Sequence, residues 1–171
     1  MIWQKDSTPT VQNYFLEPGY LYLPSTPTII STVLGSSVGV SIYDTKRNIG
    51  AMNHFLYPST YDRAKATGIY GNVATMALVK MLIDRGSNIK HLEAQILGGA
   101  FDPKVCEKNI GFENIGVAKS IILKKGVKIV SEDTGGTVGR KIMFNTLTGE
   151  IVIIKVEQLR LGDWFPYNRA R

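Results

Sequence analysis

The chain has 171 residues, of which 44% are hydrophobic and 20% are charged, and its formal net charge is +6. This composition excludes an intrinsically disordered chain and is typical of one folded domain. The single cysteine, Cys106, excludes a disulfide within the chain and argues against a cysteine-based metal site. Because the N-terminus has no apolar signal core and no apolar run reaches ~20 residues, we expect a cytoplasmic protein without membrane insertion.

The first third of the chain predicts short strands separated by turns. Pro18-Gly19, Pro24 and Pro27 interrupt the early apolar runs, and a polar loop at residues 44–48 joins two later runs as a hairpin. The predicted strands cover residues 11–16, 20–23, 28–34, 38–43 and 49–56.

The rest of the chain predicts two helices and four further strands. A helix over residues 69–85 presents Ala74, Ala77, Leu78, Met81 and Leu82 on one face, and Gly86 ends it. A second helix over residues 107–124 has Phe112, Ile115, Ala118 and Ile122 along one face. Gly126 ends this helix. The predicted strands cover residues 91–97, 127–132, 141–145 and 150–156.

Many sequential strands with two helices, and no regular alternation of strand and helix, indicate an α+β protein. We expect a β-sandwich or a mixed sheet system flanked by the two main helices. The ends, residues 1–10 and about 157–171, are polar or mixed in character, and we expect them to be mobile.

The stretch from Ser31 to His54 combines a tight turn with two residues of catalytic type. Ser37 projects a hydroxyl at the turn, and His54 lies in the following strand. Covalent catalysis needs an attacking atom and a base within hydrogen-bonding reach of each other. The alternative interpretation is structural: His54 is then a core histidine, and Ser31 and Thr32 are ordinary strand residues.

Six motifs in order make this chain resemble the CheD family, the chemoreceptor glutamine deamidases of bacterial chemotaxis. Several motifs in matching context are far more specific than any one of them. The motifs are LGSSV (34–38), GAMNHFLYP (50–58), YGNVATMAL (70–78), LGGAF (97–101), the asparagine of CEKNI (106–110), taken as the asparagine of the family's IGxxN, and EDTGGTVGRKIMF (132–144).

The resemblance implies a single CheD-like domain over residues 1–171, with a cysteine-hydrolase fold in which helices flank a β-sandwich. It implies hydrolysis of receptor glutamine side chains to glutamate with release of ammonia. No HExxH, CxxC or paired-carboxylate motif occurs, so no metal or cofactor is expected. The implied partners are the cytoplasmic helices of chemoreceptors and a CheC-type phosphatase. The family's catalytic Cys, His and Thr fall on Ser37, His54 and Ser31, with Thr32 as the other match for the threonine. Backbone N–H groups of the turn around Gly35, Ser36 and Ser37 would hold the oxyanion.

The sequence departs from the family pattern at the nucleophile, because Ser37 stands where the family has its cysteine. A serine hydroxyl forms no ground-state ion pair with histidine, so we expect the chain as written to be inactive or crippled. Ser37 as a working nucleophile is the alternative, since Ser–His hydrolases exist. The serine is either natural or engineered, and the intact motif around it favours an engineered change.

Other residues of chemical interest have plainer interpretations. We expect Cys106 to be a small structural cysteine at the start of the second helix, and His91 to lie at the surface. The glycine-rich turn at 134–139, followed by Arg140-Lys141, does not fit the spacing of a phosphate loop. The basic residues form no stripe, so nucleic-acid binding is not expected. The remaining rival function is a non-catalytic binding module for chemoreceptors or the phosphatase.

Overall fold

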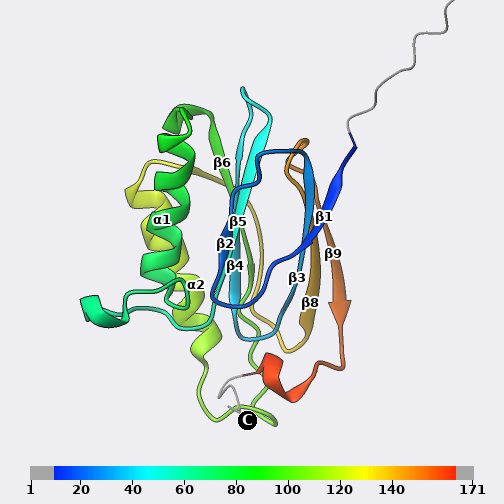
Figure 1. Ribbon diagram of the computed structural model, residues 1–171. Coiled ribbons are helices and arrows are strands. Elements are labelled where there is room, and N and C mark those ends of the chain that lie inside the picture. The colour runs from blue at the N-terminus through cyan, green and yellow to red at the C-terminus, as the bar shows by residue number, and fades with distance from the viewer. Residues whose placement is uncertain (1–9, 165–171) are drawn as a thin grey trace, which may run out of the picture.

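Two β-sheets pack face to face at the centre of the molecule (Figure 1). The computed structural model describes residues 10–164. One sheet has four strands in the order β1 (Gln12–Phe15), β3 (Thr28–Leu34), β8 (Gly139–Asn145) and β9 (Ile151–Val156). The other has five strands in the order β2 (Leu21–Tyr22), β5 (Ile49–Phe55), β4 (Val38–Asp44), β6 (Leu92–Gly98) and β7 (Lys128–Thr134).

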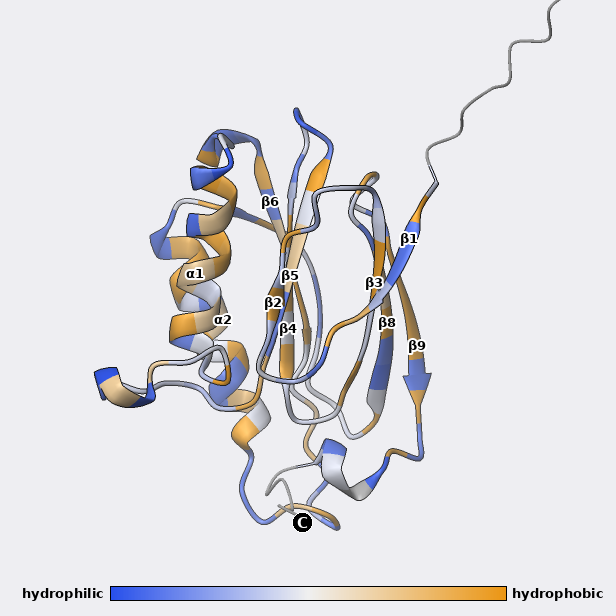
Figure 2. Cartoon of the chain, viewed as in Figure 1, coloured by the Kyte–Doolittle hydropathy of each residue, from blue (hydrophilic) through white to orange (hydrophobic). Residues whose placement is uncertain are grey.

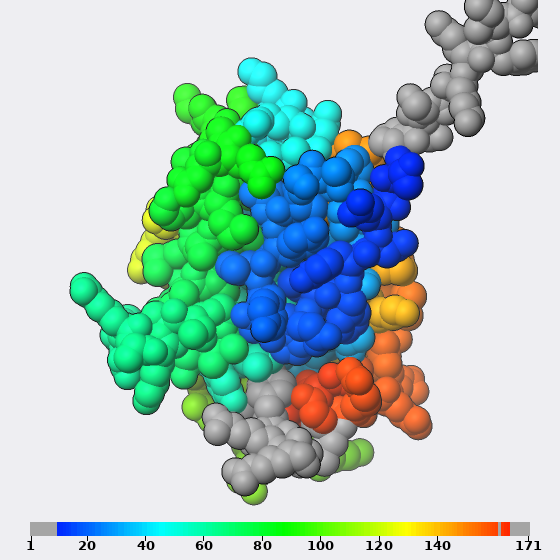
Figure 3. Space-filling model, viewed as in Figure 1, coloured from blue at the N-terminus to red at the C-terminus, as the bar shows by residue number. Residues whose placement is uncertain are grey.

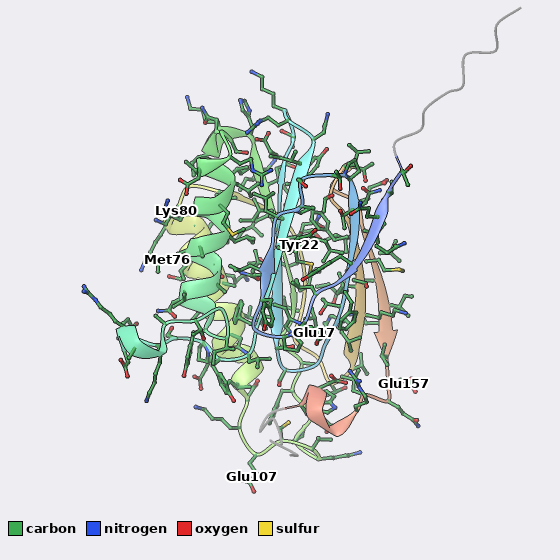
Figure 4. All side chains as sticks on the ribbon, in the orientation of Figure 1. Glu17, Tyr22, Met76, Lys80, Glu107 and Glu157 are labelled. Atoms are coloured by element: carbon green, nitrogen blue, oxygen red, sulfur yellow. The ribbon has the colours of Figure 1, made fainter. Side chains whose placement is uncertain are left out.

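The two helices, α1 (Gly71–Asp84) and α2 (Ile110–Lys124), cover the outer face of the five-stranded sheet. Their inward side chains join those of β4 in one buried cluster that includes Val40, Leu78 and Ile122. Met76 and Lys80 extend from α1 away from the sheets (Figure 4). Both helices end before a glycine with positive φ, which is the backbone geometry expected at a helix C-terminus.

The sheets are mixed, as the sequence predicts. Strand β1 pairs parallel to β3, β6 pairs parallel to β7, and every other named pair is antiparallel. Consecutive strands β3 and β4 belong to different sheets, so the turn at residues 35–37 carries the chain from one sheet to the other. The predicted α+β fold with a helix-flanked sandwich is therefore confirmed.

A second apolar cluster fills the space between the sheets. Alternate residues of β3 are buried, because successive side chains of a strand point to opposite faces. Figure 2 shows hydrophobic residues along the strands of both sheets and polar residues at the tip of the β4–β5 hairpin. The cluster comprises Leu16, Ile30, Leu34, Met52, Leu97, Ile142 and Phe144.

The second helix differs from the prediction at its start and on its face. It begins at Ile110 and not at residue 107, because the Asn109 side chain caps it by accepting a hydrogen bond from the Phe112 N–H. Phe112, which the sequence placed on one face with Ala118 and Ile122, is 74% exposed. Asn114 is buried instead, on the same face as Ala118 and Ile122.

The C-terminal segment of the described residues contacts the rest of the chain, and the mobility expected from about residue 157 stays a prediction. Leu159 and Trp164 pack with Ala100 and Cys106, and the short turn η3 (Leu161–Asp163) lies between them in sequence. The predicted mobility of residues 1–9 and 165–171 lies outside the described residues. Among residues 10–164, no helix is both long enough and apolar enough to cross a membrane.

Candidate active site

Ser37, His54 and Thr32 form a continuous chain of hydrogen bonds between the sheets. The Ser37 Oγ lies 2.8 Å from His54 Nε2, and the other ring nitrogen, Nδ1, lies 2.8 Å from Thr32 Oγ1. The Thr32 hydroxyl in turn donates to the carbonyl oxygen of Leu16 at 2.8 Å. All three residues are buried, with at most 2% of their surface exposed.

The crossover between the sheets explains why these residues meet. Thr32 lies on β3 between the core residues Ile30 and Leu34, so its side chain points toward the five-stranded sheet. His54 lies two residues after the core residue Met52 on β5, so its imidazole points toward the four-stranded sheet. Ser37 lies on the turn that joins the two sheets, and its hydroxyl therefore reaches the imidazole.

The LGGAF segment (97–101) holds the turn that carries Ser37 through backbone hydrogen bonds. The backbone N–H groups of Gly99 and Ala100 donate to the carbonyls of Ser37 and Gly35, at 2.8 and 2.9 Å. Gly98 adopts φ +96°, and a Cβ there would lie 2.4 Å from the Ser37 carbonyl oxygen. A side chain at this position would therefore displace the turn.

The hydrogen bonds assign the tautomer of His54. A hydroxyl has one proton, and that of Thr32 is donated to the Leu16 carbonyl, so Thr32 Oγ1 must accept from His54 Nδ1–H. The neutral ring then presents an unprotonated Nε2 to the Ser37 hydroxyl, which donates to it. This arrangement suits a general base that removes a proton from residue 37.

Burial keeps the imidazole neutral. It lowers the pKa of His54 from 6.5 to about 4, and the nearby Leu16 carbonyl opposes this shift only in part. At neutral pH both the Ser37 hydroxyl and the His54 imidazole are therefore uncharged, and the two do not form an ion pair.

The structure distinguishes between the two hydroxyls that the sequence left open. Ser31 does not contact His54; its hydroxyl points to the opposite face of β3 and reaches the Tyr14 carbonyl at 3.5 Å. Of the two, Thr32 is the one that contacts the imidazole. The geometry thus favours Thr32, not Ser31, as the residue that orients the ring.

Asn114 is a buried polar residue near the site that the sequence analysis missed. Its Nδ2 donates to the carbonyls of Ser36 and Leu56, at 3.1 and 3.0 Å, and the residue is fully buried. The signal was present in the sequence, because residues 110–114 read IGFEN and fit the IGxxN pattern that we had placed on CEKNI. Asn109, the asparagine of CEKNI, is the exposed cap of α2.

A hollow of about 350 Å³ leads to the imidazole. Thr32, His54, Glu17 and Arg160 are among the residues that line it. Figure 3 shows the orange-red residues of the C-terminal segment directly below the blue N-terminal residues, and Figure 4 labels Glu17 just above η3. The hollow thus reaches His54 and Thr32, while Ser37 is not among the residues that line it.

The other residues considered have structural roles. Cys106 is 3% exposed and lies in the loop before α2, packed with Trp164 and Ala100. Arg140 is also buried, and its guanidinium pairs with Asp133 and donates to the Gly135 carbonyl, so it braces the glycine-rich turn. His91 is half-buried at the end of a short 3-10 turn. Among residues 10–164, no three His, Cys, Asp or Glu side chains are grouped to hold a metal ion.

Comparison with known proteins identifies the family. The family model for CheD chemotactic sensory transduction matches residues 45–155. The chain belongs to the CheD family. A probable chemoreceptor glutamine deamidase CheD of Trichlorobacter lovleyi is 34% identical, over 91% of this chain and 97% of its own length. The chemoreceptor glutamine deamidase CheD of Thermotoga maritima is 33% identical, over 84% of this chain and 94% of its own length. Both of these relatives are named as chemoreceptor glutamine deamidases.

Proposed function

We propose that this CheD chain is a chemoreceptor glutamine deamidase whose activity is suppressed by the serine at position 37. The observation that carries the proposal is the buried Ser37–His54–Thr32 chain, with Nε2 of the neutral imidazole 2.8 Å from Ser37 Oγ. This is the geometry that a nucleophile and its base require. A cytoplasmic location and action on the cytoplasmic helices of chemoreceptors are part of the proposal.

With a cysteine at position 37, the chain has the groups for amide hydrolysis. His54 Nε2 takes the thiol proton, and the thiolate attacks the carboxamide carbon of the glutamine side chain. Backbone N–H groups of the turn hold the oxyanion. The C–N bond then breaks, and ammonia leaves with the proton from Nε2. His54 next deprotonates a water molecule, which breaks the thioester and yields glutamate.

Serine fails at the first of these steps. Its hydroxyl has a far higher pKa than a thiol, so the imidazole, whose own pKa burial lowers to about 4, does not hold a standing alkoxide. The oxygen also lies closer to Cβ than a sulfur would, so it attacks from a longer distance. His54 and Thr32 keep their hydrogen bonds around position 37. We therefore expect the single substitution Ser37→Cys to restore activity.

The test is time-resolved ammonia release, with intact-mass readout, from a receptor signalling domain. The chain as written should stay at background, and Ser37→Cys should add about one mass unit per modified glutamine because NH₂ is replaced by OH. Ser37→Ala serves as the matched control without a nucleophile. If the chain as written is as active as Ser37→Cys, serine is a working nucleophile and the suppression is refuted. If folded Ser37→Cys binds receptor and releases no ammonia, the catalytic assignment is refuted.

A non-catalytic adaptor is the second candidate function, and one surface favours it. A hollow of about 670 Å³ lies between α1 and α2, away from Ser37 and His54, and includes Met76, Val117 and Ile121. Such a partly apolar groove, which also contains Glu113 and Lys124, suits a docking helix of a chemoreceptor or of a CheC-type phosphatase. Binding of either partner should survive Ser37→Ala and be lost in Met76→Glu. Loss of binding on Ser37→Ala would contradict a separate docking role.

A further inference from the structure

Each of the three carbonyls in the turn that carries Ser37 accepts a hydrogen bond. Backbone N–H groups of the LGGAF segment hold the first and third, those of Gly35 and Ser37. The middle carbonyl, that of Ser36, is held by the side chain of Asn114 at 3.1 Å. Asn114 is thus the only one of these three donors that a substitution can remove without changing the backbone.

The bond to the Ser36 carbonyl fixes more than one atom. A trans peptide is planar, so the Ser36 C=O and the Ser37 N–H point in opposite directions. Holding the carbonyl therefore sets the direction of the Ser37 N–H, one of the groups expected to meet the oxyanion.

The second bond of Asn114 reaches the strand that carries the base. Its other N–H donates at 3.0 Å to the carbonyl of Leu56, two residues after His54. The amide orientation is set by these neighbours, because a flipped amide would place its oxygen against two carbonyl oxygens. One side chain therefore ties the nucleophile turn to the end of β5.

Asn114 is a poor choice for stability alone. The residue is fully buried, and among the described residues nothing donates a hydrogen bond to its Oδ1. A buried acceptor left without a donor destabilises the folded state. Because the unpaired Oδ1 of Asn114 destabilises the fold, we look for a role of this side chain other than stability.

We propose that Asn114 is a positioning residue of the active site, which holds the Ser37 turn and the His54 strand in register through its two N–H groups. It touches neither the substrate nor the reacting atoms. This inference rests on the proposed function for its kinetic readout, and its spectroscopic readout is independent of that function.

The kinetic test uses the full chain in the Ser37→Cys, Cys106→Ala background, where residue 37 carries the sole thiol. Asn114→Ala should lower kcat for ammonia release from the receptor domain about 10-fold to 100-fold, less than the loss of an oxyanion donor itself, with KM changed less than about threefold. The pH midpoint for alkylation of that thiol by iodoacetamide should move toward that of an ordinary thiol, ~8.5. Asn109→Ala, which removes an asparagine hydrogen bond at the start of the same helix, should leave both readouts unchanged.

The spectroscopic test uses the chain as written, which has only two histidines. In ¹⁵N NMR, Asn114→Ala should shift the ring-nitrogen resonances of His54, and Asn109→Ala should not. If Ser37→Cys proves inactive, the alkylation profile and the ring resonances still decide the inference. A folded Asn114→Ala protein with unchanged kcat, alkylation profile and ring resonances overturns it. If Asn114→Ala does not fold, Asn114→Leu, similar in shape and without the buried oxygen, is measured in its place; failure of both to fold makes Asn114 structural and also overturns the inference.

Discussion

The two faces of the five-stranded sheet bury their side chains in different ways. On the face covered by α1 and α2, Val38, Val40 and Ile42 pack into a large apolar cluster. On the face turned to the other sheet, β5 places His54 two residues after Met52, and the buried imidazole is hydrogen-bonded to the hydroxyl groups of Ser37 and Thr32. The first face stabilises the fold by burial of apolar area. On the second face, part of the buried surface is a neutral imidazole beside the Ser37 hydroxyl, so burial there is less apolar.

The largest expected effect comes from the helix-covered face. Leu78→Ala removes a fully buried side chain from the apolar cluster and should lower the free energy of unfolding by about 3–4 kcal/mol, through lost burial and a residual cavity. Urea unfolding measures this loss. In the Ser37→Cys background, the protein that remains folded should keep its kcat. A large drop in kcat would show that the two faces are coupled and would contradict the division of roles between them.

The next effect is the pH dependence that His54 gives to stability. The pKa of His54 falls from 6.5 to about 4 on folding, so between these pH values the unfolded chain binds more protons than the folded one. Stability should therefore be full above pH 6.5 and decrease by about 3 kcal/mol as pH falls to 4.

Urea midpoints at pH 7 and pH 4.5, for the chain and for His54→Gln, measure this contribution. The pKa values of Asp44 and Asp133 are lowered below 3.8, so these carboxylates lose their stabilising ionisation below the pH window of His54. His54→Gln should flatten the dependence. An equal dependence in both proteins would contradict the assignment of a desolvated imidazole.

The smallest of the three effects separates the two hydroxyls of β3. Thr32→Val removes the hydroxyl between His54 Nδ1 and the Leu16 carbonyl and should cost about 1–2 kcal/mol of stability, because the polar groups left behind are buried. Ser31→Ala, its matched control, should change stability by less than about 0.5 kcal/mol. In the Ser37→Cys background, only Thr32→Val should lower kcat. The reverse pattern would restore Ser31 as the orienting residue.

Local signals in the sequence were sufficient to predict most of the architecture. Strand β3 runs over Thr28–Leu34 as predicted, and Gly86 follows the end of α1 as predicted, because alternation and turn residues act over a few neighbouring positions. The motifs also identified the family and drew attention to Ser37 and His54, since six ordered matches carry information that no single residue does.

The choice between Ser31 and Thr32 required the folded chain. Adjacent residues of a strand face opposite sides, and β3 has apolar residues on both: Ile29 and Val33 on one, Ile30 and Leu34 on the other. Hydrophobic alternation therefore cannot tell which hydroxyl points inward. Pairing with β8 on one side and the approach of β5 from the facing sheet set the choice.

The same holds for Asn114. In a helix read by hydrophobicity, Phe112 is the obvious inward residue and an asparagine is not. The carbonyls that make Asn114 inward, those of Ser36 and Leu56, lie 78 and 58 residues away in the chain. A polar group is buried where its hydrogen-bond partners are, and only the folded chain brings such distant partners together.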